Sequence, residues 1–458
     1  MPLDDRTGQI VTTESAAAVR ALDAAADALL GHRADVPRHL LAALAADPDL
    51  ALGHAWLGLM LRLAARRDRM AEAGRRLALA RAAVATRGAT PREVAMIAAL
   101  AAWEERGDME EAAARLEAGC GAAPPDPVRF KLAQTIRFLL GDAAGMREAS
   151  AAMLPRYAPG QLGRGFILGC HAFNLEETGE ARAAEALGRE AVALDARDLW
   201  AAHAVGHVME GEGRAAEGIA WLAGVRAEPG DVGYFARHIV WHQALFHLHL
   251  GQRDAALALF DGAVHQPGAE DVRDIANAVS LLWRLQAQGA APGTRRWDML
   301  AAACEARIGD HALGFAEAHY ALCLALAGRA AALETLIGGM RRTAQAERGT
   351  QPRLLGDLGA GIAGGIAHAQ AGDAAAALAL LLPLRSELRR IGGSNAQRDL
   401  FDRLILETCV AACRWDAARS LLGERRASRA PGVWEAGIEA RLPPRMTARP
   451  SSSACRAA

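Results

Sequence analysis

Apolar and polar positions along the chain follow helical periods, and short turns that contain glycine divide the helices into pairs. Segments such as ERGDMEEAAARL and ETGEARAAEAL join an apolar helix to a second helix rich in alanine. The first five turn glycines are spaced 34, 38, 34 and 38 residues apart. Glycine favours such turns because it adopts positive φ without steric cost. The complete set is Gly107, Gly141, Gly179, Gly213, Gly251, Gly289, Gly328 and Gly372.

A period of 34 residues is that of tetratricopeptide (TPR) repeats, in which each unit is a pair of antiparallel helices. One unit cannot bury its apolar face alone, so we expect residues 16–440 to form one continuous right-handed superhelix of stacked pairs. Hydrophobic residues make up 52% of the chain and aromatic residues only 5%, which favours helices over strands. The sequence predicts an all-α, TPR-like α-solenoid. Residues 1–15 and 441–458 have the composition of disordered ends.

Charge and apolar patterning narrow the classes of partner. Lys and Arg number 52 and Asp and Glu 53, for a net charge of −1, so we expect no nucleic-acid partner. The most apolar run, ALALLLPL, is too short to cross a bilayer, so we expect no membrane partner. No secretory signal opens the chain and its 7 cysteines are scattered, which favours a cytoplasmic protein. The only lysine, Lys131, is interpreted as a mark of GC-rich codon usage.

Histidines concentrate in two adjacent repeats, in the segments HAVGHVMEGEGR and HIVWHQALFHLH. When each turn glycine is counted as repeat position 15, His203, His207 and Glu210 take positions 5, 9 and 12. These positions face the concave groove of TPR proteins. His238 and His242 take positions 2 and 6 of the next repeat. Residues three or four apart share one helix face, and neighbouring helices pack about 8–10 Å apart, so we expect these side chains to meet.

Such a cluster has three interpretations. Histidines at i and i+4 can hold one divalent metal ion, and a carboxylate completes a ligand set suited to Zn, Fe or Mn. The predicted metal ligands are His203, His207, Glu210, His238 and His242. Alternatively, the imidazoles act as general acids and bases near neutral pH, with Glu176, His207 and Glu210 as candidate catalytic residues. In the third interpretation, the histidines are half-buried polar residues that bond to backbone carbonyl groups.

The histidine-bearing words and their order resemble the tetratricopeptide repeat protein 38 family over positions 160–430. The matching words include HAFNLEETG, WHQALFHLH, SLLWRLQAQG, AHYALCLALAGR and IGGSNAQRDLFDRL. The resemblance implies a TPR superhelix and no settled reaction. One departure is Ala316 and Glu317, where family members often carry Asn or Asp. The residues that match family words, taken with Glu210, are the expected ligand-binding set: His171, Glu176, Glu177, His203, His207, Glu210, His238, Trp241, His242 and His319.

These observations leave two functions open. The first is a binding or scaffold protein whose pocket, lined by His and Glu, takes a peptide, a partner protein or a small molecule. Many peptide-binding TPR grooves clamp a carboxylate with Lys, Arg and Asn at positions 2, 5 and 9. Histidine stands at these positions here, so a basic or apolar peptide is favoured. The alternative is an enzyme, metal-dependent or using histidine as acid and base, that acts on a small molecule within the superhelix.

A last motif, GGSNAQRDLFDRL, predicts a helix that begins after a Gly-Gly break with Ser394 as its N-cap. Asn395, Gln397, Arg398 and Asp399 gather at the start of this helix. Backbone N–H groups at a helix start can hold an anion. The alternative interpretation is a network of capping bonds and salt bridges that closes the superhelix.

Overall fold

The computed structural model describes residues 2–225, 233–268 and 270–444. The described chain is helical apart from a two-stranded antiparallel hairpin of β1 (Leu3–Asp4) and β2 (Ile10–Val11). The predicted all-α class is confirmed. None of the described helices combines the length and apolar character that crossing a bilayer requires.

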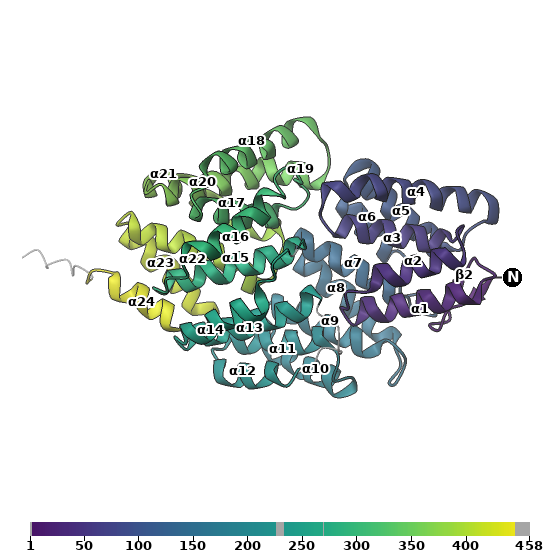
Figure 1. The fold of residues 1–458 in the computed structure, drawn as a ribbon. Coiled ribbons are helices and arrows are strands. Elements are labelled where there is room, and N and C mark those ends of the chain that lie inside the picture. Colours follow the sequence, from purple (N-terminus) through teal and green to yellow (C-terminus); the bar gives the residue numbers. More distant parts are fainter. Residues whose placement is uncertain (1, 226–232, 269, 445–458) are drawn as a thin grey trace, which may run out of the picture.

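The helices follow one another around the molecule in chain order (Figure 1). The first group is α1 (Ala16–Leu30), α2 (Val36–Ala46), α3 (Ala51–Leu63), α4 (Arg67–Arg87), α5 (Pro91–Arg106), α6 (Met109–Glu117), α7 (Pro127–Leu140), α8 (Ala143–Met153) and η1 (Leu154–Arg156). The second is α9 (Arg164–Glu177), α10 (Ala181–Leu194), α11 (Leu199–Gly211), α12 (Ala215–Ala223), α13 (Tyr234–His249), α14 (Arg253–Leu259) and η2 (Phe260–Val264).

The remaining helices form the C-terminal part of the chain. They are α15 (Val272–Ala287), α16 (Thr294–Glu305), α17 (Gly314–Leu326), α18 (Ala330–Ala346), α19 (Thr350–Leu354), η3 (Leu355–Gly359), α20 (Ala360–Gln370), α21 (Ala374–Leu384), η4 (Arg385–Ile391), α22 (Asn395–Ala411), α23 (Trp415–Ser428) and α24 (Val433–Arg441). Figure 1 shows α22 and α23 close to α15, and α22 contacts α15 directly.

Left-handed turns separate the paired helices. All eight predicted turn glycines have positive φ, between 64° and 90°. At Gly107 this conformation lets its N–H donate to the Trp103 carbonyl and end α5. The same turn occurs without glycine at Ala65 after α3 and at Cys413 after α22, with φ of 52° and 54°. The pairing therefore extends beyond the turns that glycine marks in the sequence.

Alternate helices pack against one another in succession. Helix α9 contacts α11, α11 contacts α13, α13 contacts α15, and α15 contacts α17. Each also packs against the following helix of its own pair, as α9 does against α10. This arrangement brings α11 and α13, one repeat apart in sequence, side by side. Large side chains such as Trp241 and Phe173 are fully buried between these helices.

The two halves of the chain are joined by hydrogen bonds between distant segments. The Thr350 N–H donates to the Gly107 carbonyl at 2.9 Å, and the Ala430 N–H donates to the Gly211 carbonyl at 2.9 Å. Residues at the C-terminal end therefore lie against helices from the middle of the sequence.

The N-terminal segment differs from the expected disorder of residues 1–15. Val11 is fully buried, and the Thr12 N–H donates to a Glu93 carboxylate oxygen at 2.9 Å. Asp5 forms a buried ion pair with Arg92. The prediction of disorder is based on composition, which does not show that the buried guanidinium of Arg92 requires the Asp5 carboxylate as its partner. At the other end α24 ends at Arg441, and the predicted disordered tail from residue 445 onward lies outside the described residues.

Candidate metal centre

Two adjacent helices bring four histidines to one point in the interior. His203 and His207 lie one turn apart on α11, and His238 and His242 lie one turn apart on α13. The i, i+4 spacing places each pair on one helix face, and α11 packs against α13. All four side chains are buried, with exposed fractions of 1–6%. The structure therefore brings together the four histidines that the repeat spacing predicts.

The Nε2 atoms of the four rings face one another. His203 Nε2 lies 3.0 Å from His238 Nε2 and 3.1 Å from His242 Nε2, and these last two are 3.2 Å apart. His207 Nε2 lies 2.9 Å from His203 Nε2. For a metal–nitrogen distance of about 2.0–2.1 Å, ligands are about 3.3–3.4 Å apart in a tetrahedron and about 2.9 Å apart at right angles. The observed separations fall within this range.

The shape of the cluster also limits the coordination geometry. The Nε2 atoms of His203, His238 and His242 form a nearly equilateral triangle. In a square plane any three ligands include one opposed pair, about 4.1 Å apart at these bond lengths. The triangle is therefore the face of a tetrahedron or of an octahedron and not part of a square plane.

Carboxylates contact the outer nitrogens of two rings. His242 Nδ1 lies 3.1 Å from Glu210 Oε2, and His207 Nδ1 lies 3.2 Å from Glu176 Oε2. An ionised carboxylate only accepts hydrogen bonds, so His242 Nδ1 carries the hydrogen and His242 Nε2 keeps its lone pair toward the centre. The contact between His207 and Glu176 has the distance of an ion pair but not the geometry of a hydrogen bond. Histidine ligands of metal ions usually have this outer contact, which fixes the tautomer and orients the ring.

An amide has the same role for a third ring. His238 Nδ1 lies 3.3 Å from Asn277 Oδ1, and Gln397 Nε2 donates to the same oxygen at 3.5 Å. His203 Nδ1 is buried and has no hydrogen-bond partner among the described residues. The lone pairs of at least His238 and His242 therefore converge on one buried point, an arrangement that a cation stabilises.

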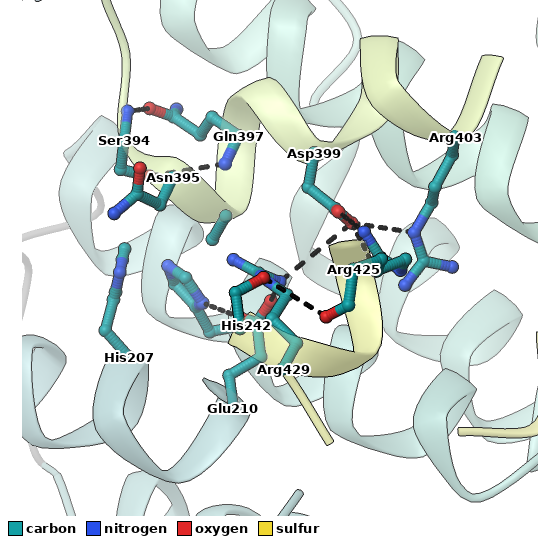
Figure 2. Close-up of polar contacts among 12 residues, drawn as sticks. His207, Glu210, His242, Ser394, Asn395, Gln397, Asp399, Arg403, Arg425 and Arg429 are labelled. Atoms are coloured by element: carbon teal, nitrogen blue, oxygen red, sulfur yellow. Dashed lines mark hydrogen bonds and ion pairs between the residues drawn. The ribbon is translucent and has the colours of Figure 1, made fainter. Parts of the chain in front are cut away.

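Glu210 lies outside the group of four nitrogens. Its carboxylate accepts from Arg429 at 3.1 Å on the side away from His242 (Figure 2). Burial alone would raise the pKa of Glu210, but the hydrogen bond from His242 and the charge of Arg429 lower it. Glu210 is therefore an ionised group that orients the His242 ring, in a different place from the inner ligand position that the sequence predicts.

A second acidic group adjoins His207. Glu176, Glu177 and His207 offer ligand atoms within 4.8 Å of one another. The Asn395 N–H donates to Glu177 at 2.7 Å, and Arg398 donates to it at 3.3 Å. Burial and the neighbouring Glu176 raise the pKa of Glu177 to about 7. The group held at the start of α22 is thus a carboxyl group of the protein itself.

The predicted N-cap of α22 is confirmed. The Ser394 hydroxyl accepts from the Gln397 N–H, and the Gln397 side chain accepts from the Ser394 N–H, which forms a capping box (Figure 2). This box fixes the side chain of Gln397, whose amide reaches Asn277. The GGSNAQRD motif therefore reaches two histidines, His238 through Gln397 and Asn277, and His207 through Asn395 and Glu177.

Three other predicted site residues lie outside the cluster. His171 is half-buried and its Nδ1 lies 2.9 Å from the Ser150 hydroxyl. His319 is buried, and its Nδ1 donates to a backbone carbonyl one turn earlier at 2.8 Å. Trp241 stacks on the His238 ring with centroids 5.2 Å apart. His171 bonds to Ser150 of the neighbouring helix α8 and His319 to a carbonyl of its own helix α17, whereas Trp241 packs directly against the cluster.

Two cavities reach the cluster. The first, called here the inner cavity, reaches His203 and His238 and has mainly aromatic and amide walls. The second is polar, reaches His207, and is lined by Glu176, Glu177 and arginines of α23 and the segment after it. A small molecule in the inner cavity would therefore lie beside two of the four imidazoles.

Sequence analysis missed Asn277 and Arg429. Asn277 stands at position 3 of its repeat when Gly289 is counted as position 15, so the groove-facing positions 2, 5, 9 and 12 exclude it. Its one signal is its place on the next helix of the series, 39 residues after His238. Arg429 lies 219 residues from Glu210, and no repeat spacing relates the two.

Protonation of the cluster is opposed by its surroundings. Burial and the charges of neighbouring histidines lower the pKa of His203 and His238, and lower that of His242 to about 4. Burial acts on His207 in the same direction, but the Glu176 carboxylate raises its pKa. At neutral pH three rings are therefore neutral and able to bind a metal ion.

This pattern predicts acid sensitivity of the metal-free protein. An unfolded histidine titrates near 6.5, so the stability contributed by rings with lowered pKa is complete above pH 6.5 and lost as pH falls toward about 4. For His242 alone the loss is about 2–3 kcal/mol by pH 4.5. His207 and Glu177, whose pKa values are raised, act in the opposite sense. They are outnumbered by histidines whose pKa is lowered, among them His32, His203, His238, His242 and His319.

Urea denaturation in EDTA at pH 7.5, 6.5, 5.5 and 4.5 measures the effect. We expect the free energy of unfolding to fall by at least about 3 kcal/mol between pH 6.5 and 4.5. A stability that is constant or rises over this interval would contradict the assignment of neutral, buried imidazoles.

Fold and site together define an all-α protein with a buried cluster of four histidines, three of which have carboxylate or amide groups on their outer nitrogens. No model of a known protein family matches the chain.

Proposed function

We propose that the protein binds one divalent transition-metal ion through the Nε2 atoms of His203, His207, His238 and His242. The observation that carries the proposal is the convergence of these four buried nitrogens at separations of 2.9–3.2 Å. The outer contacts to Glu176, Glu210 and Asn277 support it, because they orient the rings as metal-binding histidines are oriented elsewhere.

The all-imidazole set narrows the choice of ion. Imidazole ligands suit zinc, iron, copper and nickel, whereas manganese prefers carboxylates and water. With Glu210 on the outer side of His242, the inner set contains no carboxylate. Zinc and iron are therefore favoured over manganese. Four ligands complete a tetrahedral zinc site, whereas octahedral iron would keep two positions for a small molecule.

We further propose that the centre acts on a small molecule and not on a peptide. The four histidines have exposed fractions of at most 6%, and the inner cavity beside them is enclosed by side chains. A peptide groove needs exposed side chains along an open surface. Acid–base catalysis is the second candidate, favoured by the raised pKa of His207 beside Glu176 among rings whose pKa is lowered.

The surrounding architecture supports a TPR-like superhelix of the tetratricopeptide repeat protein 38 type. Helices pair across left-handed turns, and the first helices of successive pairs pack on one another. In this proposal the repeat provides the rigid backbone that holds α11 and α13 in register. Ligands placed on packed helices are positioned more accurately than ligands on loops.

Elemental analysis tests the metal proposal. Protein expressed in medium containing zinc and iron, then purified without chelator, is expected to retain close to one ion of zinc or iron per chain. Preparations without metal should take up one equivalent of Zn²⁺ or, under anaerobic conditions, Fe²⁺. Wild-type protein that contains no metal and binds neither added ion at micromolar concentration would reject the proposal and leave acid–base chemistry as the better candidate.

A further inference from the structure

The inner cavity contains a feature that the metal proposal does not use. It extends from His203 and His238 to Lys131, the only lysine of the chain. Its volume is about 80 Å³, several times the space that one water molecule needs. Aromatic rings form much of its wall, namely Phe138, Trp200, Tyr234, Phe235 and Phe315.

Lys131 is a buried cation without an ionic partner. Its exposed fraction is 4%, its Nζ lies 3.5 Å from Cys170 Sγ, and no described carboxylate lies within ion-pair distance. Burial raises the pKa of Cys170, so this sulfur remains a neutral thiol. The ammonium also lies 4.2 Å above the Trp200 ring, a contact that compensates only part of its desolvation. A charge left in this state costs folding free energy unless a ligand pairs with it.

Other polar atoms of the same wall also lack partners. Asn174 Oδ1, His32 Nε2 and Trp200 Nε1 are buried and have no hydrogen-bond partner among the described residues. His32 is held between Trp200 and Phe235, with ring centroids 4.6 and 4.4 Å away. Buried polar groups in native proteins are nearly always hydrogen-bonded, so several unpaired groups along one cavity indicate a site for a polar ligand.

One connected wall joins the lysine to the histidines. The Trp200 ring lies under the Lys131 ammonium and also contacts the His203 ring, with centroids 5.2 Å apart. Phe235 contacts both His203 and His238. A small molecule between these rings would therefore lie between the Lys131 ammonium and the rings of His203 and His238.

The charge of the wall indicates a monoanion. Arg273 also lines the cavity, but its Nε donates to Asp271 at 2.8 Å, so this pair is neutral. Lys131 therefore contributes the one positive charge among the described residues of the wall that has no carboxylate within ion-pair distance. A carboxylate matches one charge, whereas a phosphate dianion would leave a second charge unpaired in an enclosed apolar site.

We propose that the inner cavity, whose volume is about half that of a cavity that holds benzene, binds a small aliphatic carboxylate, whose carboxylate pairs with Lys131 and whose short apolar end lies toward His203 and His238. The proposal of a binding site depends only on the inner cavity and on Lys131. Its identification as the substrate site rests on the proposed metal centre, whose ion would lie beside the far end of the ligand.

Calorimetric titration tests the site with defined probes. The probes are acetate, propanoate and butanoate, each compared with its matched primary alcohol, on the full chain with and without Zn²⁺. We expect at least one acid to bind wild type at least about tenfold more tightly than its alcohol, as a charge-assisted bond requires. Lys131→Met should reduce acid binding at least about tenfold and leave the alcohols unchanged, and Lys131→Arg should retain acid binding.

The melting temperature of the free variants gives a second readout. Without ligand, Lys131→Met is expected to melt no lower than wild type, because it removes an unpaired buried charge. A large drop would show that the ammonium is a structural group and would overturn the proposal, as would equal binding of acids and alcohols or no acid binding at 10 mM. Lys131-dependent binding in protein that never takes up metal would support the carboxylate site while rejecting the metal centre. Metal uptake without acid binding would support the metal centre and overturn the carboxylate site.

Discussion

Replacing His203 with alanine is expected to weaken metal binding by about a hundredfold to a thousandfold. Four-ligand zinc sites bind with about 10–16 kcal/mol in total, so one ligand accounts for about 3–4 kcal/mol. His203 gives the clearest test of the four, because its Nε2 lies within 3.1 Å of those of His207, His238 and His242 while its Nδ1 has no described partner. Its removal leaves no carboxylate unpaired.

His319→Ala is the matched control. This histidine is equally buried, at 1% exposed, but its ring bonds to a carbonyl of its own helix α17 and lies outside the cluster. Competition with a chromophoric zinc chelator measures both variants, and circular dichroism confirms that each is folded. Equal affinity of His203→Ala and wild type, or an equal loss in His319→Ala, would show that the four nitrogens do not form the binding site.

Replacing Asp399 with asparagine is expected to destabilise the protein by about 3–5 kcal/mol. Asp399 is 5% exposed, and Arg403 Nε donates to it at 2.7 Å (Figure 2). Arg425 also bonds to it, and Arg284 and Arg429 lie within 4.0 Å. Burial acts to raise the pKa of Asp399, but the surrounding guanidinium groups lower it well below its ordinary value. Neutralising this carboxylate leaves several buried cations without their shared partner.

Asp402→Asn provides the control, because Asp402 lies one turn further along the same helix α22. Its side chain is 40% exposed and its contact with Arg385 is a surface ion pair, for which we expect a loss below about 1 kcal/mol. Urea denaturation at pH 7.5 compares the two variants. A loss for Asp399→Asn no larger than that for Asp402→Asn would show that the buried arginines are balanced by other groups.

Most of the helical pairing could be predicted from the sequence, because glycine marks turns that require positive φ. All eight glycines have this conformation in the structure. The exceptions have a physical cause. His32, Ala65 and Cys413 adopt φ of 52–56° although they are not glycine, so their turns carry no sequence signal. Non-glycine residues rarely take this conformation, and surrounding packing must hold them in it.

The convergence of four histidines was also predictable, since one repeat period relates α11 to α13 and the i, i+4 spacing fixes the helix face. The position of Glu210 was not. Repeat position 12 gives the direction in which a side chain leaves its helix but not the partners that reach it from elsewhere. Arg429 contacts the carboxylate from 219 residues away, while His242 contacts its other oxygen. Asn277 and Lys131 likewise depend on packing between repeats.

The carboxylates beside the histidines are held by residues from the C-terminal end of the polypeptide. Asn395 bonds to Glu177 across 218 residues of sequence, and Arg429 bonds to Glu210 across 219. During synthesis, helices α9 to α13 leave the ribosome long before their C-terminal partners exist. The imidazoles can therefore meet early, but their orientation is completed only when α22 to α24 have docked. In the proposed metal centre, loading would accordingly be a late step of maturation, and an ion captured by the nascent chain would still be exchangeable.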